Sequence, residues 1–208
     1  MNKNKGMLIV ISGPSGSGKG TICEEILSKR KDLTVSVSAT SRIPRINDIE
    51  GKTYFFKTVQ EFQEMIENNE LLEWVKYCDN YYGTPRKSLE IKLNEGVNVI
   101  LEIDVVGGLK VKQKYPESIL VFILPPSFKD LLFRLKCRGT EDEEIINKRI
   151  KKAVDEIEYG KKYDYYVQND TVEKAVIQIE KIIDGEKSRL SRNLGRFSEF
   201  IVTIKEVF

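Results

Sequence analysis

The sequence contains no histidine, only three cysteines, no long apolar run and almost no net charge. Histidine is the side chain that most often transfers protons near neutral pH and ligates transition metals, so its absence excludes most sites of both kinds. Cys23, Cys78 and Cys137 lie far apart and are odd in number, which fits neither a metal site nor a secreted disulfide framework and predicts a cytoplasmic protein. Any chemistry therefore has to use carboxylates, lysine, arginine or a metal carried by a substrate.

The remaining composition predicts a soluble globular protein with one α/β domain and small insertions. Of 208 residues, 40% are hydrophobic and 32% are charged, and 34 basic against 32 acidic residues leave a net charge of +2. A balance so close to neutral gives no reason to expect nucleic-acid binding. No stretch approaches the roughly 18–20 apolar residues that span a bilayer, and the polar segment 1–6 is too short for a signal peptide, so we expect no membrane partner.

A glycine-rich segment follows the apolar run at residues 7–11 and has the pattern of a phosphate-binding loop. Glycines allow the backbone to fold closely around phosphate oxygens, and the N-terminus of a following helix adds a positive field. The residue after the lysine is glycine, where the stricter motif has Ser or Thr, and a hydroxyl follows one position later. The predicted ATP-binding loop consists of Gly13, Pro14, Ser15, Gly16, Ser17, Gly18, Lys19, Gly20 and Thr21.

Apolar runs alternate with segments of helical periodicity, which predicts a central parallel sheet covered by helices. The predicted strands are residues 7–12, 33–39, 98–104, 118–124 and 163–167. The predicted helices include 18–30, a long helix from a capping box at 140–143 to about residue 159, and a last helix over 171–192. Residues 42–95 are rich in aromatic side chains with shorter strand signals, so they are interpreted as a small β-rich insertion.

Charged side chains follow two of the predicted strands. Arg42 and Arg45 flank a proline after the second strand and could clamp a phosphate, although a solvated basic loop has the same pattern. Glu102 and Asp104 close a later strand and share one face, where a carboxylate often organises Mg²⁺; a polar strand terminus is the simpler reading. The ends of parallel strands border the ligand crevice of an open sheet, which favours the functional interpretation for both pairs.

A third charged set comprises Arg134, Arg138 and Arg149. Arginines placed over phosphates neutralise charge on a transferring group. On spacing alone, pairing with the acidic run 141–144 on a helix surface is an equally good explanation.

Taken together, these motifs resemble the guanylate kinase family over residues 7–190. The resemblance is specific because eight segments occur in the right order and spacing. They are GPSGSGKGT (13–21), SVSATSRIPR (36–45), GKTYFF (51–56), LEW (72–74), NYYGT (80–84), LEID (101–104), RGT (138–140) with NKR (147–149), and ND (169–170).

The resemblance implies a P-loop three-layer fold in which ATP phosphorylates GMP with the help of Mg²⁺. It implies a core formed by 1–38, 96–136 and 161–192, a GMP-binding region at 39–95 and a lid at 137–160. The residues that it assigns to catalysis are Lys19, Arg42, Arg45, Arg138 and Arg149. Those that it assigns to GMP are Ser38, Arg42, Arg45, Tyr54, Glu73, Tyr82, Thr84 and Asp104, and it adds Asn169 to the ATP site.

The chemistry of guanine agrees with this assignment. Guanine presents N1–H and an amino group as donors, and ionised Glu73 only accepts. Adenine has no hydrogen at N1, and an unpaired buried polar group costs about 1–3 kcal/mol, so AMP should be rejected. Without the resemblance, Glu73 would be interpreted as a charge on a strand surface. Asp104 has two candidate roles, at the guanine or in water-mediated support of Mg²⁺; we favour the first and leave the second to Glu102.

Two other functions fit parts of the pattern. A non-catalytic guanylate-kinase-like module that binds phosphopeptides would have a degenerate phosphate loop, and a kinase for another small phosphate would lack the guanine-facing residues. The intact loop and the complete guanine-facing set favour the nucleotide kinase. Residues 193–208 extend beyond the usual family end, and the sequence leaves open whether they pack on the body, pair with another subunit or are disordered; it also leaves the oligomeric state open.

Overall fold

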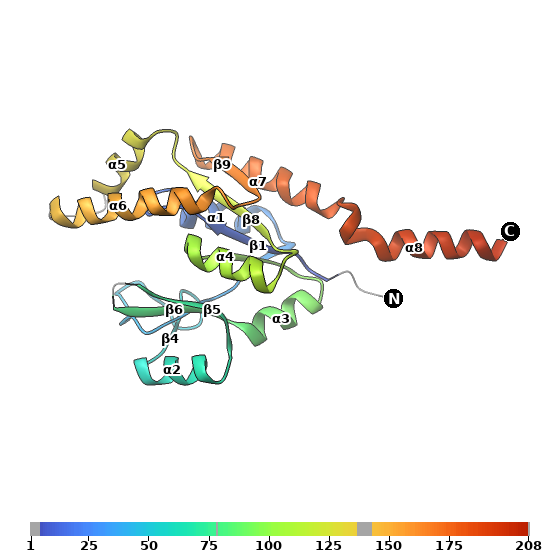
Figure 1. The fold of residues 1–208 in the computed structure, drawn as a ribbon, viewed down its shortest axis with the longest axis horizontal. Coiled ribbons are helices and arrows are strands. Elements are labelled where there is room, and N and C mark those ends of the chain that lie inside the picture. The colour runs from blue at the N-terminus through green and yellow to red at the C-terminus, as the bar shows by residue number, and fades with distance from the viewer. Residues whose placement is uncertain (1–4, 78, 137–142, 208) are drawn as a thin grey trace.

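The computed structural model describes residues 5–77, 79–136 and 143–207. In this part of the chain, nine strands form two sheets, and eight helices accompany them (Figure 1). The core sheet is parallel and has the strand order β2-β7-β1-β8-β9. Its strands are β1 (Leu8–Ser12), β2 (Leu33–Val35), β7 (Asn98–Glu102), β8 (Ile119–Leu124) and β9 (Tyr165–Gln168).

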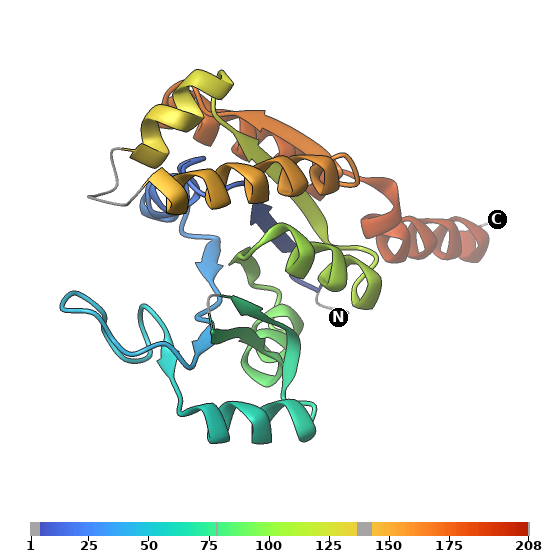
Figure 2. The same ribbon diagram turned by 60° about the vertical axis from the view of Figure 1, so that its left-hand side comes forward.

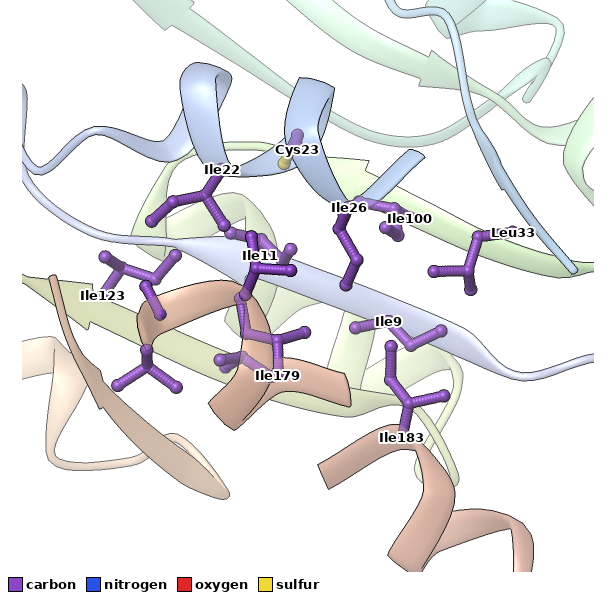
Figure 3. Packing of buried hydrophobic residues seen from close by; sticks show 14 of the residues in the cluster. Ile9, Ile11, Ile22, Cys23, Ile26, Leu33, Ile100, Ile123, Ile179 and Ile183 are labelled. Atoms are coloured by element: carbon purple, nitrogen blue, oxygen red, sulfur yellow. The ribbon is translucent and has the colours of Figure 1, made fainter. Parts of the chain in front are cut away.

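Helices cover both faces of the core sheet, because its strands are apolar on both sides. On one face, Ile9 and Ile11 of β1 pack with side chains of α1 (Lys19–Lys29) and α7 (Val172–Lys187), as Figure 3 shows. On the other face, Leu8 and Val10 pack with α3 (Arg86–Asn94) and α4 (Val105–Lys114). The alternation of these four residues follows the two-residue period of a strand. The result is the three-layer α/β fold that the sequence predicts.

The second sheet belongs to the insertion. It has the order β4-β3-β6-β5, with strands β3 (Ala39–Thr40), β4 (Phe55–Phe56), β5 (Leu71–Tyr77) and β6 (Asn80–Pro85). The helix α2 (Val59–Glu67) closes it by burying Phe62 beside Leu71. Thr58 and Glu61 form a capping box at the start of α2, which satisfies two of the free N–H groups there. The insertion therefore has a small core of its own (Figure 2).

Two predicted boundaries are wrong. The strand expected over 33–39 is two strands in different sheets: the Ser36 amide still bonds to the Ile100 carbonyl, and the chain then crosses to β3. The helix expected over 171–192 ends at Lys187, and a separate helix, α8 (Leu190–Val207), extends away from the body (Figure 1). In each case one continuous sequence pattern covers two elements that pack against different neighbours.

The remaining helices border the site. After Pro125-Pro126, Ser127 accepts a hydrogen bond from the Asp130 amide and starts α5 (Phe128–Lys136). The long helix α6 (Glu143–Gly160) packs against α4 and α5. The predicted capping box at 140–143 falls largely outside the described residues. None of the helices described here has the length and apolar composition needed to cross a bilayer.

Candidate functional site

A cavity of about 430 Å³ lies where the carboxyl ends of the core strands meet the second sheet and α6. Strand order reverses around β1, which is the point where open α/β sheets bind ligands. The lining comes from the loop 13–20, the strand ends at 102–104, the second sheet and α6. Its residues are Gly13, Ser15, Gly16, Gly18, Lys19, Gly20, Ser38, Arg45, Tyr54, Glu73, Val75, Tyr82, Gly83, Glu102, Ile103, Asp104, Arg149, Lys152 and Glu156.

The loop at one end of the cavity requires glycine for two reasons. Gly16 and Gly18 have φ angles of 86° and 89°, a region that side chains disfavour. A Cβ atom on Gly13 would lie 2.2 Å from the Ile123 carbonyl oxygen, and one on Gly18 would lie 2.3 Å from Nδ2 of Asn169. The loop thus lies close against its surroundings at the N-terminus of α1, the geometry that favours an anion.

Lys19 is the first residue of α1, and its ammonium group lies over this loop. Its Nζ donates hydrogen bonds to the carbonyl oxygens of Gly13, at 2.7 Å, and Pro14, at 3.2 Å. These contacts keep a positive charge at the loop end of the cavity, where phosphates would be attracted.

Asn169 lies beneath the loop and is buried, at 3% exposure. Its Nδ2 donates to the Ser17 carbonyl oxygen at 2.8 Å, and its own carbonyl oxygen accepts from Arg134 at 3.2 Å. The predicted residues Asn169, Ser17 and Arg134 are therefore brought together, but as a support behind the loop and not on the cavity wall.

The acidic residues after β7 face the loop from the side. Both carboxylate oxygens of Glu102 lie 3.8 Å from the position a Cβ would take on Gly20. Asp104 uses one oxygen to cap α4, accepting from the Gly107 amide at 2.7 Å. In the described part of the chain, no three His, Cys, Asp or Glu side chains cluster as a metal cage. A cation here would have to take ligands from phosphates and water, the habit of Mg²⁺.

Glu73, on β5, is the most deeply buried acid of the cavity, at 3% exposure. The Thr84 hydroxyl on β6 donates to its Oε1 at 2.7 Å, and a Cβ on Gly107 would come within 2.9 Å of its Oε2. Burial raises the pKa of Glu73 to about 7, assisted by Asp104, while the hydrogen bond from Thr84 opposes the shift. Thr84 itself is buried behind this carboxylate, and Ser38 lines the cavity nearby.

Two tyrosines form an aromatic wall between the two ends of the cavity. Tyr54 and Tyr82 meet edge to face with their ring centres 6.0 Å apart. Burial raises the pKa of Tyr54, so its hydroxyl stays protonated and is a donor.

The two arginines of the insertion differ in position. Arg45 lines the cavity, whereas Arg42 lies outside it, pairs with Asp48 at 2.8 Å and covers the Tyr54 ring at 5.4 Å. Asp48 also accepts from the Arg45 amide at 2.7 Å, and this bond, with Arg42, holds the pKa of Asp48 low. Asp48 is a site neighbour that the sequence analysis missed, although an aspartate three residues after Arg45 is typical of a local turn.

The helix α6 contributes Arg149, Lys152 and Glu156 to the cavity. Intervals of three and four residues place all three on one helical face. Only Arg149 was predicted; counting the helical period onward from it would have found the other two. The other predicted lid arginine, Arg138, lies outside the described residues.

Known proteins similar to this chain share one name. A sequence-family profile described as guanylate kinase matches residues 5–186. A guanylate kinase of Caldanaerobacter subterraneus is 54% identical over 191 residues, covering 92% of this chain and 93% of that protein. One from Clostridium acetobutylicum is 52% identical over 188 residues, 90% of each chain. Among solved structures, the guanylate kinase of Anaplasma phagocytophilum matches with a TM-score of 0.76 and 31% identity, covering 91% of this chain and 90% of the other.

Proposed function

This chain belongs to the guanylate kinase family, and on that basis we propose that its cavity binds ATP and GMP end to end and transfers the γ-phosphate of ATP to GMP, giving ADP and GDP. The observation that carries the proposal is the position of Glu73, a buried acceptor in the same cavity as the phosphate loop. One end suits phosphates and the other suits a base with hydrogen-bond donors. A phosphoryl transfer between two nucleotides needs both.

At the acceptor end, Glu73 would accept from N1–H and the amino group of guanine, with Thr84, Ser38 and Asp104 around the base. Thr84 already holds one carboxylate oxygen, which fixes the orientation of the group before a ligand arrives. Binding of a donor pair favours the ionised carboxylate and offsets the burial that raises its pKa.

The GMP phosphate would lie between this end and the loop, held by Arg42, Arg45, Tyr54 and Tyr82. Arg45 and both tyrosines line the cavity. Arg42 would exchange its ion pair with Asp48 for the phosphate, a turn of one side chain from the rim of the cavity. A guanidinium group suits this exchange because it binds carboxylate and phosphate in the same bidentate manner.

ATP would occupy the loop 13–21, with Lys19 at its outer phosphates and Asn169 stabilising the loop from behind. Arg149, together with Arg138, would neutralise charge on the transferring group. No general base is required, because the phosphate of GMP is largely ionised near neutral pH. Closure of the lid, 137–160, over the core and the region 39–95 would exclude water and limit hydrolysis of ATP.

We assign Mg²⁺ as the metal that this family of reactions uses. The donor set fits a cation held by phosphates and water, because Glu102 lies beside Gly20 and a three-residue metal cage is not found among the described side chains. Such an ion would offset phosphate charge when bound. Glu102 would hold one of its waters.

The two rival functions are weaker. A non-catalytic phosphopeptide module and a kinase for another small phosphate both conflict with relatives of 45–54% identity that are named guanylate kinases and are matched over nearly their full length. We also propose a cytoplasmic location, consistent with Cys23 being a buried free thiol.

Replacement of Glu73 tests the acceptor site. Glu73→Gln keeps the size but turns a donor toward the donors of guanine, so we expect the KM for GMP to rise roughly tenfold or more, from a cost of about 1–3 kcal/mol, while the KM for ATP changes little. The measurement is steady-state kinetics with each substrate varied in turn. Glu67→Gln is the matched control, an equal change of charge at an exposed position at the end of α2. Equal loss for both substrates would contradict the assigned contact.

A further inference from the structure

One acidic side chain lies at the phosphate end of a cavity that is otherwise built for anions. Glu156 is on the cavity face of α6, one turn beyond Lys152, and its side chain is only 13% exposed. Its Oε1 lies 3.8 Å from Nζ of Lys152. An anionic ligand in the loop would therefore meet a carboxylate of like charge.

The surroundings of Glu156 are those of a bound anion. The backbone of Ser15, within the phosphate loop, donates a hydrogen bond to it, and Lys19 and Lys152 attract it. Asp104, at the start of α4, repels it, and its charge also reaches the buried hydroxyl of Tyr163. Burial raises the pKa of the carboxyl against the two lysines, so the group is held there by specific contacts and not by water.

We propose that Glu156 is a positioning residue that occupies the phosphate loop as a stand-in for a nucleotide phosphate, and that ATP displaces it on binding. The proposal rests on the function proposed above. Between turnovers, the carboxylate satisfies a loop amide and part of the charge of Lys19. When phosphate takes its place, Lys152 loses its partner and becomes available to the nucleotide together with Arg149, so occupancy of the loop is coupled to the position of α6.

This exchange has a direct consequence for affinity. Part of the attraction between the loop and a nucleotide is offset by the displacement of Glu156, so ATP binds less tightly, and ADP leaves more readily, than the loop alone would permit. Removal of the negative charge should therefore tighten binding, whereas removal of an ordinary structural contact would not.

Two variants test the proposal by calorimetric titration. Glu156→Gln removes the charge and retains the shape, and Glu156→Ala removes the group altogether. Both should lower the Kd for ATP and for inorganic tripolyphosphate by about fivefold or more, since like charges a few ångströms apart repel strongly when partly buried. In kinetics, the KM for ATP should fall and the KM for GMP should stay constant. Glu158→Gln is the control, since Glu158 is two residues along the same helix, 63% exposed, and pairs with Lys161 away from the cavity.

An unchanged or raised Kd in both variants, with thermal melting that confirms a folded protein, would overturn the proposal and leave Glu156 as a structural ion pair. So would an equal change in Glu158→Gln, which would reflect net charge alone. Failure of the proposed function gives a different result: the wild-type protein would bind tripolyphosphate without phosphorylating GMP. The two failures are therefore distinguishable.

Discussion

At the scale of the residue, the site depends on how closely groups approach Glu73. Gly107, in the first turn of α4, leaves just enough room: a Cβ there would lie 2.9 Å from Oε2 of Glu73 and 3.4 Å from Oδ1 of Asp104. Glycine is otherwise unfavourable in a helix by about 1 kcal/mol. The glycine is therefore explained by the carboxylate that lies against it.

Gly107→Ala should displace the Glu73 carboxylate and raise the KM for GMP roughly tenfold, since the Thr84 hydrogen bond and the guanine contacts depend on its position. Gly185→Ala, in α7, provides the matched control, because a Cβ there meets nothing within 4 Å. We expect it to raise the free energy of unfolding by about 0.5–1 kcal/mol and leave the kinetics unchanged. A normal KM for GMP in Gly107→Ala would show that the acceptor site tolerates a shifted carboxylate.

The raised pKa of Glu73 predicts a pH-dependent stability. Its pKa is about 7 in the folded protein and about 4.5 in the unfolded chain, so between these values the folded state holds more protons and stability falls as pH rises. Glu73→Gln removes this cost. The variant should gain stability relative to the wild type as pH increases from 4.5 to 7, by at most about 3 kcal/mol, and the difference should be constant above pH 7. Thermal unfolding of the ligand-free proteins across pH 5–8.5 measures it; a difference that does not vary with pH would contradict the buried, neutral carboxyl.

At the scale of the element, the phosphate loop is supported by a side chain from a distant part of the chain. Asn169, directly after β9, reaches the Ser17 carbonyl oxygen, 152 residues away in sequence. The sequence motif alone associated Asn169 with the nucleotide, and the structure adds a contact beneath the loop. A loop held in this way keeps its amides oriented before the nucleotide binds.

Asn169→Ala should therefore weaken ATP and inorganic tripolyphosphate alike, by roughly tenfold, through loss of a buried hydrogen bond. Gln168→Ala is the control: its side chain bonds only to Asp170 among the contacts that the structure records, on the outside of the same strand end. Titration with both ligands decides the matter. If ATP binding weakens and tripolyphosphate binding does not, Asn169 contacts adenine and is not a support of the loop.

Sequence periodicity predicted most elements but not where two of them separate. The strand over 33–39 is apolar throughout, and nothing local shows that Val35 belongs to one sheet and Ala39 to another. The split depends on pairing with β7 and with β6, which are distant in sequence. The loop 13–21 was predictable because its chemistry is local; the pairing of Arg42 with Asp48 and the position of Glu156 were not, because each depends on tertiary contacts.

At the scale of the whole molecule, a rigid parallel sheet carries the phosphate loop, and a separate small sheet carries the guanine-facing residues. Each unit has its own core, so the distance between the two ends of the cavity can change without unfolding either. The helix α8 extends away from this arrangement, anchored at its start where Arg192 bonds to buried Glu186 and to the Glu117 carbonyl oxygen. The sequence motifs pointed to both nucleotide sites, whereas the helical form of this extension was outside their reach.

The central claim is that one cavity joins a phosphate loop to a guanine site. The most direct measurement compares GMP and AMP as acceptors in a coupled assay that follows ADP formation from ATP. We predict a kcat/KM for GMP at least about a hundredfold above that for AMP, because AMP would leave the buried acceptor Glu73 facing a lone pair, at a cost of about 3 kcal/mol. Equal use of the two acceptors, or no phosphorylation of GMP, would contradict the account.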